Sequence, residues 1–463
     1  MRVTSLVLTV LVLPGIVGLS PATVLAAPLP ADEHPVLDEI AAAVSPDAMH
    51  STIQALVGFG TRHTLSDTVS NTRGIGAARR WAQSRFGEIS KDCGGCLTII
   101  TPSRTFTGTR IPSPTQVVDV VAIQKGTTDP DRVIVITGHI DSRVSDPMNA
   151  TSDAPGADDD GSGAATVLET ARVLSRYKFA ATLVYSIDSG EEQGLYGGKV
   201  IADYARAQGW RVEADLNNDI VGDTTGQSGV VDNTHVRVFS EGTKAVETPK
   251  QADARRYNGG EVDSPSRNLA RYIDELASRY LTHFSATMVY RTDRYSRGGD
   301  QVPFLENGFP AVRFTEAVEN YTREHQDVRE ENGVRYGDRI EAVDFPYLAQ
   351  VARLNAITMA SLAWAPPPPE GLAIEGAVSA DTGLKWQATP GAAAYRVFWR
   401  DTTAPRWEHA RTVGGVTATT LKGVVVDDWY FGVASVSADG FASPAEFPGP
   451  AGSFVSEPAA KAK

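Results

Sequence analysis

The stretch Pro155-Gly156-Ala157-Asp158-Asp159-Asp160-Gly161-Ser162-Gly163 places three adjacent carboxylates among glycines. Adjacent carboxylates repel one another, so a nearby cation would account for their grouping. Glycine lets the backbone turn sharply and come close to a bound group. Taken alone, the pattern is also typical of a calcium loop or of a solvated helix cap. The stretch therefore predicts a cation site, with these two alternatives left open.

The flanking segments place this stretch between a strand and a helix. The near-continuous apolar run 132–137 is typical of a strand buried on both faces, and it ends at Gly138-His139-Ile140-Asp141-Ser142. A His and several Asp around one turn form a mixed nitrogen and oxygen ligand set, which suits zinc. After the stretch, apolar residues recur at helical spacing: Ala164, Val167, Leu168, Ala171 and Leu174.

Strands and helices alternate along most of the chain. A second buried strand, 182–188, ends at Gly190-Glu191-Glu192-Gln193-Gly194, and residues 214–218 lead into Asp219. This alternation predicts an α/β fold, with a mostly parallel mixed sheet sandwiched by helices. In such folds, ligands bind beyond the carboxyl ends of the strands. We therefore expect four polar residues to converge at that edge: His139, Glu191, Glu192 and Asp219.

Bulk properties exclude several classes of protein. The chain has 463 residues, a net charge of −13 and no long basic run, which argues against a nucleic-acid binder. Arg2, the apolar run 6–13 and the small residues at 24–26 predict a signal peptide over residues 1–26, and hence a secreted or periplasmic protein. No later stretch is apolar enough to span a bilayer, and no feature indicates an oligomeric state.

The chain has two cysteines, Cys93 and Cys96, separated by two glycines. In a cytosolic protein this spacing can be catalytic, and half of a zinc ribbon is a further reading that no second Cys pair completes. In an exported chain a local disulfide is expected, because the compartment is oxidising.

A change of composition divides the chain. Residues 365–370 form a proline-rich linker, which separates a predicted main domain, 27–364, from residues 371–451. The latter contain short alternating strands between turn residues and predict a small β-sandwich. The sandwich resembles a fibronectin type III domain with Trp386 in its core, and it would act as a binding module or as a spacer. Residues 452–463 are predicted to form a disordered tail.

Taken in order, the motifs of the main domain resemble the M28 family of zinc peptidases, in particular the co-catalytic two-zinc aminopeptidases. Each motif is common by itself, but their order and spacing together are specific. The resemblance covers about residues 50 to 362 and rests on five motifs: 138–142, 155–163, Ser189 to Gly194, Asn218-Asp219 and Glu324-His325-Gln326-Asp327.

The resemblance implies two zinc ions per chain and a position-by-position ligand set. Asp159 would bridge both ions. His139 and Asp219 would complete the coordination of one ion, and Glu192 and His325 that of the other. A bridging anion offsets the repulsion between two cations, and each ion keeps a place for water or substrate.

Further roles follow from the same resemblance. Glu191 would be the general base, and Asp141 would orient the ring of His139. The resemblance does not identify the group that stabilises the oxyanion of the tetrahedral intermediate; Tyr295 and Tyr321 are candidates, with ordinary packing as the alternative for each. Asp300-Gln301 stands where many members of the family have Asp-His, beside the substrate pocket.

These features predict a secreted aminopeptidase, which hydrolyses N-terminal peptide bonds of peptides or proteins with a zinc-bound hydroxide. A dipeptidase or a carboxypeptidase would use much the same metal centre. Two other functions stay open on this fold: a glutaminyl cyclase-like transferase with one zinc, and a non-catalytic binding protein.

Overall fold

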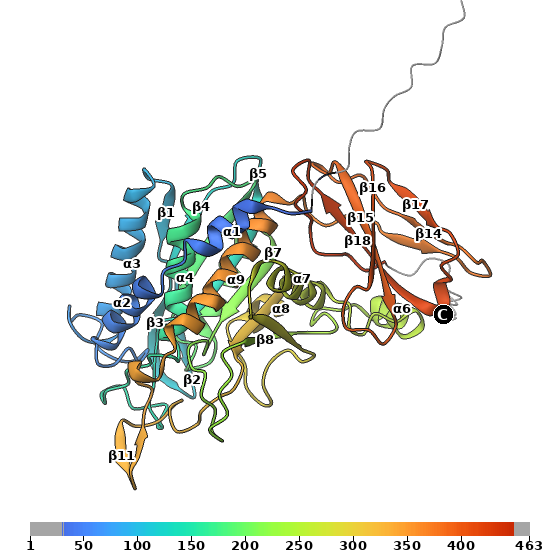
Figure 1. Cartoon of the computed structure of the whole chain (residues 1–463). Helices are drawn as coiled ribbons and strands as arrows, with labels where there is room; N and C mark the ends of the chain where they lie inside the picture. Colours follow the sequence, from blue (N-terminus) through green and yellow to red (C-terminus); the bar gives the residue numbers. More distant parts are fainter. Residues whose placement is uncertain (1–29, 31, 449–463) are drawn as a thin grey trace, which may run out of the picture.

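The computed structural model describes residues 30 and 32–448, so the predicted signal peptide and C-terminal tail lie outside the described residues. Its centre is a mixed sheet of eight strands (Figure 1). The four middle strands, β6, β5, β7 and β10, are parallel to one another. In spatial order the strands are β1 (Leu97–Ile100), β4 (Val120–Gln124), β6 (Ala181–Asp188), β5 (Asp129–His139), β7 (Arg211–Asn218), β10 (Ala311–Glu316), β8 (His235–Ser240) and β9 (Ser285–Val289).

The middle strands are buried on both faces, as their apolar runs predict. In β5, Ile134 and Ile136 belong to the core on one side of the sheet, and Val133 and Val135 to the core on the other. All residues of β6 are buried. The parallel register of β5 and β6 places their last residues side by side, so the loops that follow them start at the same edge.

Helices cover both faces of this sheet. The short α5 (Tyr196–Ala207) and α8 (Gln301–Glu306) contribute to one core. The larger core includes six helices: α1 (Pro35–Ala42), α2 (Pro46–Val57), α3 (Gly74–Asp92), α4 (Gly161–Leu174), α7 (Pro265–Tyr280) and α9 (Phe345–Trp364). No helix within residues 30 and 32–448 combines the length and hydrophobicity needed to cross a bilayer.

Several smaller elements lie outside this sheet. Two are hairpins, β2 (Ser103–Gly108) with β3 (Ile111–Val118) and β11 (Arg329–Glu331) with β12 (Val334–Tyr336). The others are α6 (Pro249–Asn258) and the 3₁₀ helices Ile340–Ala342 and Val426–Asp428.

After α9 the chain forms two antiparallel sheets of three strands each. One contains β13 (Ala373–Glu375), β14 (Thr382–Lys385) and β17 (Ala418–Leu421), and the other β16 (His409–Val413), β15 (Ala394–Asp401) and β18 (Trp429–Val436). Both contribute to one core, in which the rings of Trp386 and Tyr395 lie 5.1 Å apart. The predicted α/β fold with an additional small β-sandwich is confirmed, whereas the fibronectin type III assignment and the domain boundaries stay predictions.

The sandwich packs directly on the α/β domain, beside α7 (Figure 1). The ring of Phe441 lies 5.0 Å from that of Trp364 at the end of α9. From α7, Arg271 Nε donates to the carbonyl oxygen of Pro405 at 2.8 Å. The sandwich therefore has a defined orientation on its neighbour.

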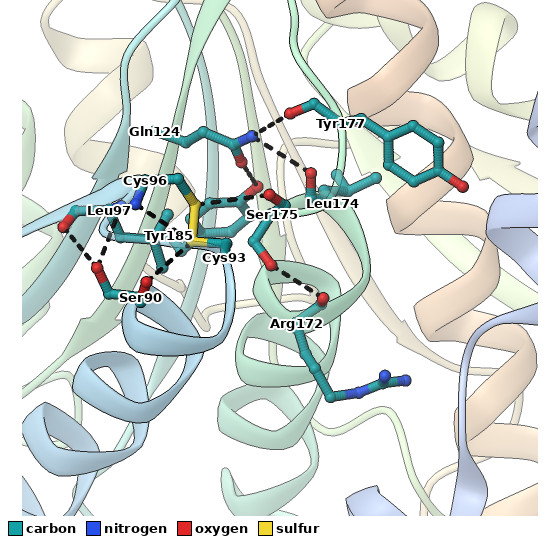
Figure 2. Close-up of a disulfide and its surroundings, with 10 residues drawn as sticks. All are labelled: Ser90, Cys93, Cys96, Leu97, Gln124, Arg172, Leu174, Ser175, Tyr177 and Tyr185. Carbon is teal, nitrogen blue, oxygen red and sulfur yellow. Dashed lines mark hydrogen bonds between the residues drawn. A yellow bond between two sulfur atoms is a disulfide. The ribbon is translucent and has the colours of Figure 1, made fainter.

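The predicted disulfide between Cys93 and Cys96 is present (Figure 2). It closes the turn between α3 and β1, with the two Cα atoms 5.6 Å apart. Ser90 Oγ also bridges this turn, because it donates to the carbonyl oxygen of Leu97 at 3.0 Å and accepts from the Leu97 N–H at 3.3 Å.

Because the bridge spans a sequence separation of only 3, we expect it to contribute modestly to stability. The chain-entropy argument gives about 2 kcal/mol for so short a loop. The double variant Cys93→Ala/Cys96→Ala should therefore fold and lose about 2 kcal/mol in urea denaturation. The parent measured with a reductant is the control. Failure of the double variant to fold would contradict this expectation.

Candidate metal centre

The predicted metal ligands and the predicted base all lie at the carboxyl-end edge of the sheet, the edge at which β5, β6, β7 and β10 end. These six residues come from five positions in the fold: His139 at the end of β5, Asp159 just before α4, Glu191 and Glu192 between β6 and α5, Asp219 directly after β7, and His325 between β10 and β11. Five of them form what we call the ligand cage: His139, Asp159, Glu192, Asp219 and His325.

Asp159 lies at the centre of the ligand cage. Its Oδ1 is 3.2 Å from His139 Nε2, which is also 3.8 Å from Asp219 Oδ1. Its Oδ2 is 2.7 Å from His325 Nε2, which is also 3.2 Å from Glu192 Oε1. The two oxygens of one carboxylate thus face two separate groups of ligand atoms, which is the geometry that a bridging ligand requires.

Buried polar atoms of the ligand cage test whether a cation fits. Among the described residues, His139 Nε2, Asp159 Oδ2 and Glu192 Oε1 are buried and make no hydrogen bond of acceptable geometry, although the last two lie near His325 Nε2. Buried polar groups are rarely left unsatisfied, because the cost of desolvation is then not offset. Cations placed between these atoms would satisfy them, and a set of imidazole nitrogens and carboxylate oxygens suits zinc. The residues present therefore fit a bound divalent cation such as zinc.

Asp141 connects several parts of the site. When His139 Nδ1 carries the proton, it donates to the Asp141 carbonyl oxygen at 3.0 Å and leaves the Nε2 lone pair facing the ligand cage. The Asp141 carboxylate accepts from the backbone N–H groups of Glu191 and Glu192, each at 3.3 Å. Burial alone would raise the pKa of Asp141, but its bonds with His139 and Thr64 hold that pKa below its ordinary value.

Glu191 lies beside the ligand cage. Its Oε2 is 3.9 Å from His139 Nε2, and its side chain is 11% exposed. Burial raises the pKa of Glu191 well above its ordinary value. His139 opposes this shift, and the carboxylates of Asp219 and Glu192 add to it. A carboxylate whose pKa is raised in this direction is better matched to proton transfer near neutral pH.

The other two carboxylates of the acidic stretch are buried, which corrects the alternative of a solvated cap. Asp160 is the N-cap of α4, since its Oδ1 accepts from the Gly163 N–H at 2.8 Å. Its Oδ2 accepts from the His139 N–H at 2.8 Å, so the cap also fixes the end of β5. Asp158 lies with Asp223 and Glu316 in a separate buried acidic group.

Three charged residues beside the ligand cage were not predicted. Glu324 has a carboxylate oxygen close to ligand atoms of Asp159 and His325. Arg143 Nε donates to Glu192 Oε2 at 2.8 Å, and its Nη2 is 2.6 Å from His325 Nδ1. Glu324 belongs to the motif 324–327, and Arg143 directly follows the motif 138–142. In the sequence, only this proximity to the predicted ligands indicated that either residue lies at the site.

Arg313 is the third of these residues. It is fully buried in β10, and its Nη2 lies 2.8 Å from Asp219 Oδ1. Burial alone would lower the pKa of Arg313, but the carboxylates of Asp219 and Asp293 hold that pKa above its ordinary value. A buried arginine needs an anion as its partner. The occurrence of Arg313 within a mostly apolar strand was therefore the feature of the sequence that indicated a buried anion nearby.

The residues predicted near the substrate pocket are more scattered. Tyr295 and Tyr321, the candidates for oxyanion stabilisation, are 82% and 56% exposed. Asp300 is buried and accepts from the Gly198 N–H at 3.0 Å, and Gln301 Nε2 donates to Asp293 Oδ2 at 2.6 Å. Gln301 thus serves to hold the segment that precedes α8.

An α/β sheet whose carboxyl-end edge carries a buried cage of histidines and carboxylates is an arrangement that suits a bound metal, and metal-dependent hydrolases are one class of protein that uses it. Within this class, the sequence profile of Peptidase family M28 matches residues 119–339. A probable zinc metalloprotease of Leptosphaeria maculans is 43% identical over 411 residues, which are 88% of this chain and 95% of the relative. The chain therefore belongs to peptidase family M28.

Two further comparisons agree with this assignment. A probable zinc metalloprotease of Pyricularia oryzae is 44% identical over 417 residues, covering 88% of this chain and 83% of the relative. Among solved structures, the LapA aminopeptidase of Legionella pneumophila superposes with a TM-score of 0.52 at 19% identity, covering 73% of this chain and 78% of that chain. This last likeness concerns the fold alone.

Proposed function

We propose that the chain is a secreted aminopeptidase that holds two zinc ions in the ligand cage. The observation that carries the proposal is the position of Asp159, whose two oxygens face His139 and His325 at 3.2 and 2.7 Å. Relatives named probable zinc metalloproteases support zinc as the metal. A glutaminyl cyclase-like centre with one zinc would leave one of these two groups of ligand atoms without a cation.

The ligands divide into two sets that share Asp159. His139 and Asp219 would hold one ion, and Glu192 and His325 the other. Zinc bound here would supply Lewis-acid activation of the water nucleophile and of the scissile carbonyl. Asp141 keeps the His139 ring in the orientation that such binding requires.

Glu191 would act as the general base. It accepts a proton from the attacking water at its carboxylate and passes that proton to the leaving amine. Its neighbour Glu192 cannot share this role, because its side chain faces His325 and Arg143. The backbone N–H groups of both glutamates are bound to Asp141, so the two side chains keep separate directions.

The substrate and the compartment complete the proposal. A metal centre of this kind acts on peptides or proteins, and we assign action at the amino end by analogy with the LapA aminopeptidase, which shares the fold. Secretion is supported by the predicted signal peptide and by the disulfide between Cys93 and Cys96, since disulfides persist in oxidising compartments.

The test is hydrolysis of a panel of aminoacyl-anilides with and without a chelator, together with metal analysis. We expect chelator-sensitive hydrolysis that added zinc restores, and two zinc ions per chain. N-acetylated members of the panel are the matched controls and should be resistant. Equal cleavage of blocked and free substrates would overturn the aminopeptidase assignment, and cyclisation of N-terminal glutamine with one zinc would replace it by a cyclase.

A further inference from the structure

The segment Thr61–Thr64 contacts three of the loops that carry residues of the ligand cage. These loops are 139–142, which follows β5, 153–160, which leads into α4, and 189–195, which follows β6. His63 is the one residue of this segment with a side chain of a common metal-ligating type, and it belongs to none of the candidate metal-binding groups among the described residues. We call this segment the brace.

Arg62 is the centre of the brace. Its side chain is fully buried and donates to backbone carbonyls rather than to a carboxylate. Arg62 Nε donates to the Ile140 oxygen at 2.6 Å, between His139 and Asp141. Nη1 and Nη2 donate to the oxygens of Pro155 and Gly156 at 2.5 and 2.8 Å, a few residues before Asp159. One rigid guanidinium thereby fixes the distance between two ligand-bearing loops.

The backbone around Gly156 is shaped to receive this guanidinium. Gly156 has a φ of 52°, and a Cβ atom placed on it would lie 2.8 Å from Arg62 Nη2 and 2.5 Å from the Cβ of Ser142. The glycine of the acidic stretch therefore allows a close approach between this loop and Arg62. The sequence indicated only that some group comes close to the glycines of this stretch. The structure identifies the group that approaches Gly156 as the guanidinium of Arg62.

The two residues after Arg62 reach the remaining parts of the site. Thr64 Oγ1 donates to Asp141 Oδ2 at 2.9 Å. His63 Nδ1 accepts from the Leu65 N–H at 3.1 Å, so its Nε2–H is available to the carbonyl oxygen of Pro147 at 2.9 Å. Nε2 of His63 also lies 3.1 Å from the side-chain amide of Gln193, directly after Glu192.

We propose that the brace is the positioning device of the metal centre, with Arg62 setting the separation between His139 and Asp159, and Thr64 fixing Asp141. The proposal rests on the proposed function only in taking zinc as the ligand of the cage. The brace acts through other residues and has no part in the chemistry. Because Arg62 and His63 donate to backbone carbonyls and Thr64 donates to Asp141, none of which is a predicted metal ligand, removal of the brace should loosen the ligand cage without removing any ligand.

Zinc affinity, measured by competition with a chromophoric chelator, tests the proposal. Arg62→Met should weaken zinc binding about 10- to 100-fold, as expected when groups that orient metal ligands are lost. The matched control is Arg267→Met. Arg267 is equally buried and bonds to the side chain and carbonyl of Ser240, which ends β8 at the opposite edge of the sheet. The control should lose thermal stability and keep its zinc affinity.

A second pair of variants keeps the test sharp if Arg62→Met does not fold. Thr64→Val preserves the shape of the side chain and removes the bond to Asp141, so zinc affinity should fall about tenfold. Thr64→Ser retains the hydroxyl, so its zinc affinity should equal that of the parent. Zinc affinities equal to the parent's in Arg62→Met and Thr64→Val would overturn the brace. A parent that binds no zinc would instead overturn the proposed function.

Discussion

Replacing Glu191 with glutamine should lower turnover by about two to four orders of magnitude while zinc content stays at the level of the parent. The expected size is that of losing a positioned general base. The amide keeps the volume of the side chain but cannot accept the proton of the attacking water. Since Glu191 Oε2 is 3.9 Å from His139 Nε2 and outside the ligand cage, no metal ligand is removed.

The neighbouring glutamate provides the matched control. Glu192→Gln changes the same chemical group one residue further on, but Glu192 Oε1 faces His325 Nε2 at 3.2 Å. We expect this variant to lose zinc as well as activity. Both variants require kcat, KM and metal content measured on the same preparation. Loss of zinc in Glu191→Gln would make Glu191 a ligand, and a decrease in kcat of less than tenfold would exclude it as the base.

The position of most of the ligand cage could be predicted because it follows from strand direction. Parallel strands deliver the residues after their carboxyl ends to one edge, whatever the sequence distance between them. His139 and Asp219 follow from this rule alone, since the apolar runs before them mark buried strands. His325 does not, because it lies well after β10 in an irregular loop with a φ of 54°. It was predicted through the resemblance of its motif.

The residues that hold the ligand cage could not be predicted in this way. Arg62 binds backbone carbonyls of residues 78 to 94 positions away. Because every residue has a backbone carbonyl, the sequence does not show which of them an arginine binds. Arg143 and Arg313 lie against ligands, but an arginine in a sequence is most often solvent-exposed. Their roles depend on which loops the fold brings together, and this is decided by packing rather than by local pattern.

Some local elements were missed although a signal was present. Helix α6 begins with a capping box, in which Thr248 and Gln251 exchange side-chain and backbone bonds. The mostly apolar run 117–124 has the composition of a single strand but is divided between β3 and β4, because Asp119 is buried there and accepts from the Ser189 N–H at 3.0 Å. A buried aspartate within an apolar run was the indication of this break.

The second prediction of large effect concerns the contact between the sandwich and α7. Asp263→Ala should lower the free energy of unfolding by about 3–5 kcal/mol, the range for removing one partner of a buried ion pair. Asp263 is buried between two arginines from different parts of the chain. Arg271 Nη1 lies 2.9 Å from Asp263 Oδ1, and Arg400 Nη2 lies 2.8 and 2.9 Å from its two oxygens.

The size of this effect follows from what the substitution leaves behind. The side chains of Arg271 and Arg400 are 2% and 1% exposed, so alanine would leave two buried guanidinium groups without a counter-ion. Both arginines lie over the ring of Trp407, at 5.7 and 5.4 Å, so its fluorescence should report the same transition as circular dichroism in urea. Glu375→Ala is the control, because its partner Lys385 is exposed on the same sandwich and such pairs contribute little.

The shape of the unfolding transition shows whether the sandwich and the α/β domain unfold together or separately. Asp263 precedes α7, and Arg400 belongs to β15, so this one carboxylate joins the two units. If the units unfold together in the parent, loss of Asp263 should separate the transition into two, with Trp407 following the sandwich. A single transition with unchanged stability in Asp263→Ala would mean that the other contacts between the two units suffice, among them Phe441 with Trp364 and Arg406 with Asp274.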